Sequence, residues 1–444
     1  MKIVAIIVTL VSCGLMFYVK REWKAALLVM GSMTLTLVNI PSVPLHKANF
    51  LLPVSFLLSE WPYLRWHLGE LRDCPFLGKV LLLASISALI AAFTTIYISP
   101  GTFLKCELLL KYFAIAYAFW AIKDEKSLKP ILLVSMWCLI VLTIFGIANY
   151  LTKNAIFVNA LTEGRTSLWI EDVSLGDIYA QKTRFRVLSM FTSAFDYGYI
   201  SSVILLLHIH AWYRGLESKS TFLLVLACSL FGIIFCECRI VWVSFLLSIS
   251  CFYMWNFSSS KIIVTSILVL CIFIVSYSSV PFVEEKVNKI TDVFNENSVT
   301  KGSSMQLRMS QFMYVLYYTK GHELLGLGHG YWAYNFAEDS ESIEGLFGVE
   351  SIIFQHLLER GYIGLILWAL FYAFLFRYFW KNREKARALT GLGASILTTY
   401  LIFSIGTGEL GSVYPTLLLL GFVIKSIESS KTEEKCSANN PLPQ

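Results

Sequence analysis

Long apolar stretches alternate with short polar segments along most of this chain. Most of the stretches approach or reach the roughly 17–25 residues with which a helix spans a bilayer. The stretches, thirteen in all, cover residues 3–19, 25–40, 49–60, 76–99, 103–122, 130–151, 194–213, 221–236, 240–257, 261–280, 361–376, 389–405 and 410–424. Residues 49–60 form the shortest stretch and contain Pro53. The pattern predicts an all-α, polytopic membrane helix bundle of about 12–13 transmembrane helices.

Two long polar segments, residues 152–193 and 281–349, interrupt this pattern. The second segment has helical spacing of its apolar residues over 283–294 and 305–318, and a glycine-rich turn follows at Gly326. A loop of this length with helices of its own is usually functional. We therefore expect a large, partly helical loop between two groups of membrane helices.

The composition excludes a soluble domain. Hydrophobic residues make up 56% of the chain and charged residues 15%, with a mean hydropathy of +0.64, whereas soluble domains carry about 25% charged residues. The first apolar stretch lacks a small-residue cleavage site, so we interpret it as a retained helix and not a signal peptide.

Basic residues gather in every second connection between the predicted helices, which is typical of cytoplasmic loops. The connections on the other side contain only Lys47, Lys105 and Arg239. The asymmetry predicts N-terminal transmembrane helices in residues 1–280, an outer-face loop in 281–349, C-terminal transmembrane helices in 350–427 and a cytoplasmic tail in 428–444. The basic set is Lys20, Arg21, Lys24, Arg65, Arg72, Lys79, Lys123, Lys126, Lys129, Arg214, Lys219, Arg377, Lys381, Arg383, Lys385, Arg387, Lys425, Lys431 and Lys435.

Three arginines on separate elements of the outer face are the first candidates for chemistry. Arg186 precedes the helix at 194–213, Arg239 lies in a short turn between two helices, and Arg308 lies in the second helical part of the large loop. A guanidinium stays charged and offers a planar fork of donors that suits diphosphate oxygens. The alternative is that each arginine reaches the interface or pairs locally, as Arg239 would with Glu237.

Other polar residues could assist these arginines. Glu350 opens the helix that enters the membrane after the large loop, where a carboxylate could accept a proton from an attacking sugar hydroxyl or merely favour the helix N-terminus. His329 between two glycines and Asp196 near the start of a helix are candidates for glycan contacts.

We expect no metal, cofactor or nucleic acid as a partner. His208 and His210 are two residues apart on a helix and point about 200° away from each other, so they cannot share one ion. No paired carboxylates stand out on the outer side, and no phosphate-binding glycine motif for ATP or a dinucleotide occurs. The cysteines have no metal-site or disulfide spacing.

Four short motifs carry a resemblance to a known superfamily. They are Arg186 with the Phe-Thr-Ser-Ala-Phe turn before a helix, Cys238-Arg239 opening a helix, Arg308 followed by Leu325-Gly-Leu-Gly-His-Gly-Tyr, and Glu350-Ser followed by Gly361-Tyr-Ile-Gly. In layout and motifs the chain resembles the bacterial O-antigen ligase and polymerase superfamily. Lipopolysaccharide ligases of that superfamily carry a histidine at the position of Glu350, and its Ser-Arg is Cys-Arg here. The chain therefore resembles a polysaccharide polymerase more than a ligase.

The resemblance implies a glycosyltransferase of the bacterial inner membrane whose active site faces the periplasm. Its donor and acceptor would be glycan repeat units linked to undecaprenyl diphosphate, and transfer would be inverting and independent of metal. Arg186, Arg239 and Arg308 would bind the diphosphate, while Glu350 and Arg308 would be catalytic. Fixed cations would stabilise the charge that grows on the leaving diphosphate, and a groove between helices, open to lipid, would hold the polyprenyl tail.

Two other functions remain open at the level of the sequence. A ligase would move a finished glycan from the carrier to a lipid or protein acceptor. A transporter of lipid-linked glycans would need charges near the middle of the membrane and repeated halves, and Asp196 and Glu107 are the residues that could serve it.

Overall fold

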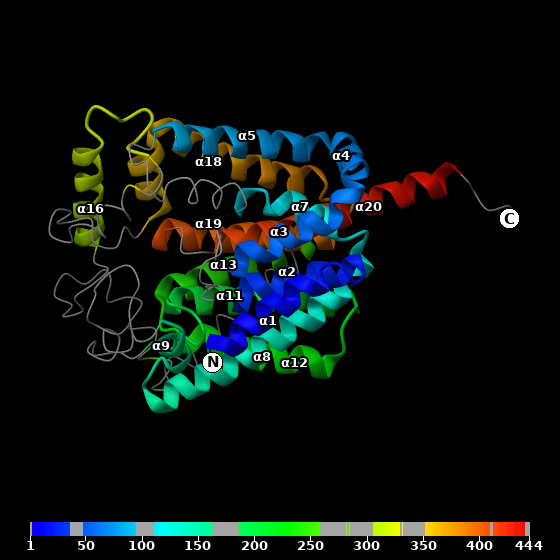
Figure 1. The fold of residues 1–444 in the computed structure, drawn as a ribbon, viewed down its shortest axis with the longest axis horizontal. Helices are drawn as coiled ribbons and strands as arrows, with labels where there is room; N and C mark the ends of the chain where they lie inside the picture. Colours follow the sequence, from blue (N-terminus) through cyan, green and yellow to red (C-terminus); the bar gives the residue numbers. More distant parts are fainter. Residues whose placement is uncertain are drawn as a thin grey trace.

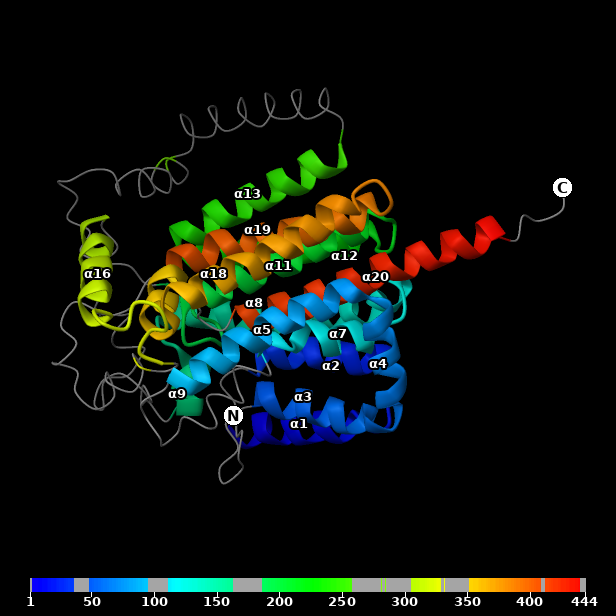
Figure 2. The same cartoon turned by 90° about the horizontal axis from the view of Figure 1, so that it is seen from above.

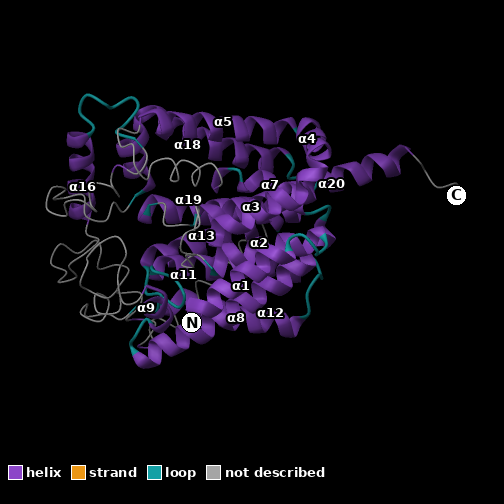
Figure 3. Cartoon of the chain, viewed as in Figure 1, coloured by secondary structure: helices purple, strands orange, loops and turns teal. Residues whose placement is uncertain are grey.

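A computed structural model describes residues 2–35, 48–94, 111–162, 186–257, 281, 284, 305–328, 331, 351–408 and 412–439 (Figure 1). All regular elements within these ranges are helices, and no strand is drawn among them (Figure 3). The prediction of an all-α helix bundle is confirmed. The predicted helix at 261–280, the helical stretch at 283–294 apart from two residues, and most of the large loop lie outside the described residues.

The helix bounds agree with the apolar stretches to within a few residues in most cases. The helix over residues 194–213 is found with both ends as predicted, and so is the helical stretch at 305–318. The longer described helices are α1 (Lys2–Leu15), α2 (Arg21–Thr34), α3 (Ala48–Glu60), α4 (Leu64–Asp73), α5 (Pro75–Thr94), α7 (Ala114–Ala121), α8 (Lys129–Thr152), α11 (Ala194–Tyr213), α12 (Lys219–Phe235), α13 (Arg239–Asn256), α16 (Met305–Tyr318), α18 (Ile352–Lys381), α19 (Arg387–Thr407) and α20 (Val413–Asn439).

Four described helices are long and apolar enough to cross a membrane, and a bent pair brings the number to five. The four are 125–152, α18, α19 and the part of α20 up to Lys431. Shorter apolar helices such as α12 accompany them. The count of twelve to thirteen spans stays a prediction, because parts of several expected spans lie outside the described residues.

The outer surface of the bundle is apolar, as a lipid-facing surface should be. Along α8, the side chains of Leu133, Trp137, Ile144 and Leu151 recur on one face and are between 45% and 73% exposed. A soluble monomer rarely exposes a continuous apolar stripe of this length, whereas a helix facing lipid requires one. The chain is a multi-pass membrane protein.

The helices run back and forth between two ends of the bundle, which lie at the left and at the right of Figures 1 and 2. We call the end that carries α9 (Ile156–Thr162), α16 and the starts of α11, α13 and α18 the loop end. The opposite end contains the basic connections. Arg214 pairs there with Glu125 at 3.0 Å, and Arg387 donates to the Trp255 carbonyl at 2.7 Å.

Polar side chains connect the interior helices to one another. Ser248 and Thr399 are hydrogen-bonded between α13 and α19 at 2.6 Å, and the Trp255 indole donates to Thr390 at 3.0 Å. Hydroxyl and small side chains let membrane helices approach closely while satisfying one another. This packing fixes α13 against α19 along their middle and at the basic end.

Candidate functional site

Arg308 reaches from the large loop onto the end of a membrane helix. It lies on α16, and its Nη2 donates to the carbonyl of Gly406 in the last turn of α19 at 2.9 Å. The last carbonyls of a helix lack intrahelical partners and form its negative end, so a cation is stabilised there. A side-chain carbon built on Gly406 would come within 2.6 Å of Ile240, so the start of α13 lies directly beside this contact.

Arg239 is the first residue of α13 and precedes Ile240 in the chain. Its side chain is partly exposed. The tight turn before it contains Glu237 in a left-handed backbone conformation, with φ of 49°. Arg239 therefore immediately precedes Ile240, which lies against Gly406, and the Gly406 carbonyl accepts from Arg308.

Arg186 reaches the same turn from the other side. The backbone N–H of Val187 donates to Phe235 in the last turn of α12 at 3.1 Å. The Arg186 guanidinium lies 5.5 Å from the centre of the Phe195 ring, and its charge acts on the buried Cys236 thiol. Arg186 and Arg239 thus adjoin the α12–α13 turn, and Arg308 contacts the end of α19 beside Ile240. We call these three residues the arginine group; that they bind one diphosphate stays a prediction.

Asp196 lies in the first turn of α11, where Ser193 accepts the backbone N–H of Phe195 at 3.2 Å and begins the helix. Its Oδ1 atom is buried and has no hydrogen-bond partner among the described residues. Lys111 is near enough to act on this carboxylate electrostatically. Asp196 therefore lies at the loop end with a buried carboxyl oxygen, and the cation that acts on it is Lys111.

Sequence reasoning overlooked Arg360, which is only 1% exposed. Its Nη1 donates to Ser87 on α5 at 3.3 Å and to Tyr112 at 3.5 Å. Tyr112 follows Lys111, so this short segment contacts Arg360 on α18 and also brings the charge of Lys111 near Asp196 on α11. The signal was available, because an ionisable residue in an apolar helix is a functional candidate by default.

The glycine-rich turn after α16 is hydrogen-bonded to the backbone of α18 where that helix is broken. The helix expected to open at Glu350 begins at Ile352, so the apolar stretch at 361–376 covers only its later turns, and Gly361 has φ of 61° and ψ of −164° inside it. Leu327 and Gly328 donate to the carbonyls of Leu358 and Glu359 at 2.9 and 3.0 Å. The carbonyls of residues 323 and 324 accept from the N–H groups of residues 362 and 363 at 2.8 and 3.2 Å.

These four bonds use the same donors and acceptors that an unbroken helix would pair with each other. The apolar side chains of Val315, Leu327 and Leu358 pack together beside them. The turn begins at Gly321, whose N–H donates to Glu323 at 2.9 Å and lowers the pKa of that carboxyl. The arrangement fixes α16, and with it Arg308, to the loop end of α18.

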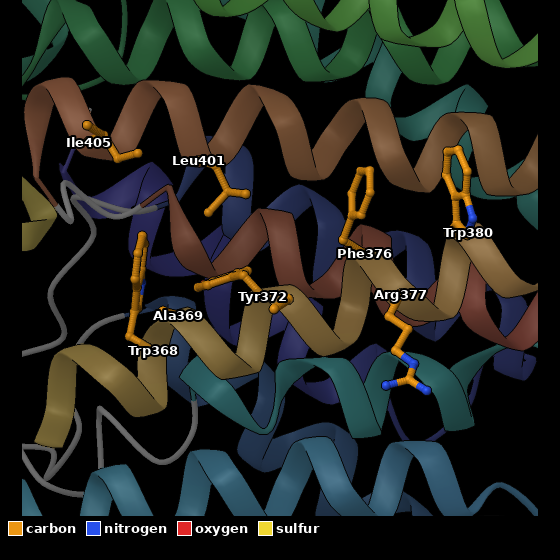
Figure 4. Close-up of a pocket in the computed structure, with 9 residues that line it drawn as sticks. Trp368, Ala369, Tyr372, Phe376, Arg377, Trp380, Leu401 and Ile405 are labelled. Atoms are coloured by element: carbon orange, nitrogen blue, oxygen red, sulfur yellow. The ribbon is translucent and has the colours of Figure 1, made fainter.

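An open apolar groove of about 610 Å³ runs along α18 and α19 (Figure 4). Trp368 and Ile405 line its loop end, and Arg377 and Trp380 line the other end. Ile405 precedes Gly406, the acceptor of Arg308. One end of the groove therefore lies one residue along α19 from the carbonyl that Arg308 contacts.

Glu350 and His329 lie outside the described residues, so their roles stay predictions. Their neighbours Ser351, which caps α18 by accepting the Ile353 N–H at 3.3 Å, and Gly328 lie at the loop end. Within the described ranges, no three metal-ligating side chains lie together. His208 and His210 contact different carboxylates, Glu217 and Glu125.

Residues 224–369 match the model of a family described as O-antigen ligase. The matched segment runs from α12 into α18 and contains Arg239, Arg308, Glu350 and Arg360, whereas Arg186 and Asp196 precede it. The match supports the resemblance to the O-antigen ligase and polymerase superfamily, whose members are glycosyl-transferring enzymes with lipid-linked glycan substrates. No curated protein matches the chain.

Proposed function

We propose that this protein polymerises undecaprenyl-diphosphate-linked glycan repeat units at the periplasmic face of the bacterial inner membrane. The observation that carries the proposal is the gathering of Arg186, Arg239 and Arg308 at one end of the bundle, next to an apolar groove. The match to the O-antigen ligase model over the segment that contains two of them supports it.

The reaction would exchange one bond at the anomeric carbon. An acceptor hydroxyl attacks this carbon from the face opposite the diphosphate, so the new glycosidic bond forms as the bond to the diphosphate oxygen breaks. The hydroxyl proton passes to the carboxylate of Glu350, and undecaprenyl diphosphate leaves as an anion. Arginine side chains would stabilise the charge that grows on this leaving group.

The donor brings its own activation and an apolar tail. Because the sugar is already bonded to a diphosphate, no nucleotide is needed, and binding donor and acceptor together supplies the entropic part of the rate. The groove along α18 and α19 suits the polyprenyl chain, because its lining is apolar and its loop end lies one residue from Gly406.

A ligase activity is the second candidate, and the description of the matched family favours it. It uses the same donor and the same leaving group, but a lipid or protein acceptor receives the finished glycan. The two activities differ in their products. A polymerase lengthens the glycan on the lipid carrier, while a ligase removes it from the carrier.

Purified protein reconstituted with a lipid-linked repeat unit tests the proposal. We expect a ladder of longer carrier-linked glycans from the wild type and a rate lowered by about 10²–10³-fold in Arg308→Ala, the usual effect of removing one donor to a developing anion. Arg308→Lys should restore only part of the rate, because an ammonium lacks the guanidinium fork.

Lys153→Ala is the matched control, since Lys153 is an exposed cation of the loop end whose ammonium lies over the Tyr150 ring. It should keep the wild-type rate. An unchanged rate in Arg308→Ala at equal protein level would remove Arg308 from the mechanism. Glycan transferred to an added lipid acceptor, without longer carrier-linked products, would replace polymerase by ligase.

A further inference from the structure

The short helix α4 crosses the basic end of the bundle between α3 and α5 (Figures 1 and 2). The chain bends by 101° between residues 50–73 and 75–90. A three-residue turn of helix, Trp61–Tyr63, leads into α4, and Cys74 separates it from α5. The helix therefore lies across the direction of the membrane-spanning helices and not along it.

The inner face of α4 carries His67 and Glu70. His67 is 1% exposed and contacts Glu60 at 3.0 Å and Glu70 at 3.4 Å. Glu60 also binds Lys24 at 2.7 Å and Arg21 at 3.3 Å, and Glu70 is bound by Lys425 on α20. The acidic groups of this region are thus turned inward and paired with cations of α2 and α20.

The outer face combines aromatic, aliphatic and cationic side chains. Trp61, Tyr63, Trp66 and Leu68 are between 49% and 68% exposed. Arg65 and Arg72 are seven residues apart and share the exposed face with Leu68. Lys79 follows on α5 and is exposed, and Asp73 is the exposed acid of the same stretch.

The placement of the large apolar side chains on the outer face is the opposite of what a helix in contact with water shows. A helix on the surface of a soluble protein turns its apolar side chains inward and its charges outward. Here His67 and Glu70 point inward while two tryptophans, a tyrosine and a leucine point outward. Amphipathic aromatic rings together with lysine and arginine are the side chains enriched where headgroups meet the hydrocarbon of a bilayer.

We propose that α4 lies in the membrane interface at the basic end and binds the headgroups of anionic phospholipids through Arg65 and Arg72. The charge balance supports this ligand, because the outward cations face one outward acid, Asp73, while Glu60 and Glu70 are neutralised inside. The Arg21 guanidinium lies 4.3 Å from the centre of the Trp66 ring and orients this ring beside the headgroups. The proposal does not depend on the glycosyl-transfer activity.

Native mass spectrometry of the purified full-length protein tests the site. The protein is titrated with dioleoylphosphatidylglycerol and, separately, with dioleoylphosphatidylcholine, and the ratio of the two affinities is measured. We expect the wild type to bind phosphatidylglycerol more tightly than phosphatidylcholine. The double substitution Arg65→Gln and Arg72→Gln should lower the affinity for phosphatidylglycerol about 10–30-fold, because each cation contributes a factor of less than about ten.

Two controls distinguish the effect of the charge at Arg65 and Arg72 from the effect of removing any two exposed cations. Arg65→Lys with Arg72→Lys should keep most of the preference, and Lys153→Gln with Lys320→Gln, which removes two exposed cations of the loop end, should keep the wild-type ratio. Equal preference in the double glutamine variant and wild type would overturn the proposal. So would a change of oligomeric state at an unchanged lipid ratio, which would assign this face to a second copy of the chain.

Discussion

Arg308 and Arg360 are two arginines of the loop end with opposite surroundings. Arg308 is partly exposed and contacts the end of α19, so a ligand arriving from the loop end can reach it. Arg360 is 1% exposed and contacts hydroxyls of two neighbouring segments. The first suits contact with a substrate. The second suits the positioning of α18 against α5, because a buried charge needs fixed partners.

Gly326 gives a residue-scale prediction about the glycine-rich turn. Its φ is 71°, and a Cβ there would come within 2.6 Å of the Gly361 backbone nitrogen and closer still to that of Arg360. Gly326→Ala therefore adds the cost of a left-handed alanine, about 1–2 kcal/mol, to an overlap with backbone worth about 1–3 kcal/mol. We expect a clearly lower midpoint of thermal unfolding in detergent and a loss of activity in the same variant.

Gly321→Ala is the matched control for Gly326→Ala. Gly321 has φ of 85°, but nothing lies within 4 Å of the added carbon. This variant should lose only the conformational part of the stability. Equal midpoints for the two variants would mean that the turn is not packed against α18 as described.

The chemistry of a residue was enough to propose some of the candidate site residues, but it did not predict which of them are buried. The three loop-end arginines were found from their chemistry and their place outside the apolar stretches. Arg360 was overlooked although its charge in an apolar helix marks it as a candidate. The burial of Asp196 near the charge of Lys111 could not be predicted, because burial depends on which helices meet, and spacing within one helix does not contain that information.

At the scale of elements, hydropathy located helices better than it located their ends. The apolar stretch beginning at Gly361 was found and a helix was expected to open at Glu350, but hydropathy left the turns between them out of the membrane span, because His356, Glu359 and Arg360 lower the local hydropathy. All three are at most 4% exposed in the structure. Protein, not lipid, surrounds them, so these turns escape the rule that membrane helices are apolar.

Two short helices, α16 and α4, show when the spacing of apolar residues predicts a helix and when it does not. The spacing of apolar residues predicted α16, whereas α4 went unpredicted. The pattern of α4 is inverted, with His67 and Glu70 inside and Trp66 outside. A search for an apolar inner face cannot find such a helix, although the exposed aromatics beside Arg65 and Arg72 would have indicated the membrane interface.

The groove along α18 and α19 gives an element-scale prediction. Ala369 lines it and is exposed, so Ala369→Phe should fill part of the space without disturbing the buried face of α18. We expect the KM for a donor with a long polyprenyl chain to rise about tenfold, with a smaller rise for a short-chain donor that does not extend along the groove.

Leu370→Phe is the control for this substitution, because Leu370 is the exposed neighbour on α18 and does not line the groove. It should leave both KM values near those of wild type. A rise for short and long donors alike in Ala369→Phe would show that the substitution acts on the site itself and not on a tail in the groove.

At the scale of the whole molecule, the two ends of the bundle differ in the side chains that they carry. The end opposite the loop end gathers the basic connections, including Arg214, Lys425 and Arg387, and pairs part of them with carboxylates and helix carbonyls. The loop end carries the arginine group and the glycine-rich turn after α16, which is hydrogen-bonded to α18. Positively charged loops remain in the cytoplasm during insertion, so the basic end is expected there and the arginine group on the periplasmic side.

Labelling of single cysteines tests this orientation. The ten native cysteines are first replaced by serine or alanine in a variant that keeps its expression level, and one cysteine is then placed at Lys153 or at Lys385, exposed residues of the loop end and of the basic end. A maleimide that cannot cross the inner membrane should modify Lys153→Cys in spheroplasts and Lys385→Cys only after lysis. The opposite result would place Arg186, Arg239 and Arg308 in the cytoplasm, where a periplasmic glycan could not reach them, and the proposed polymerase would have to be abandoned.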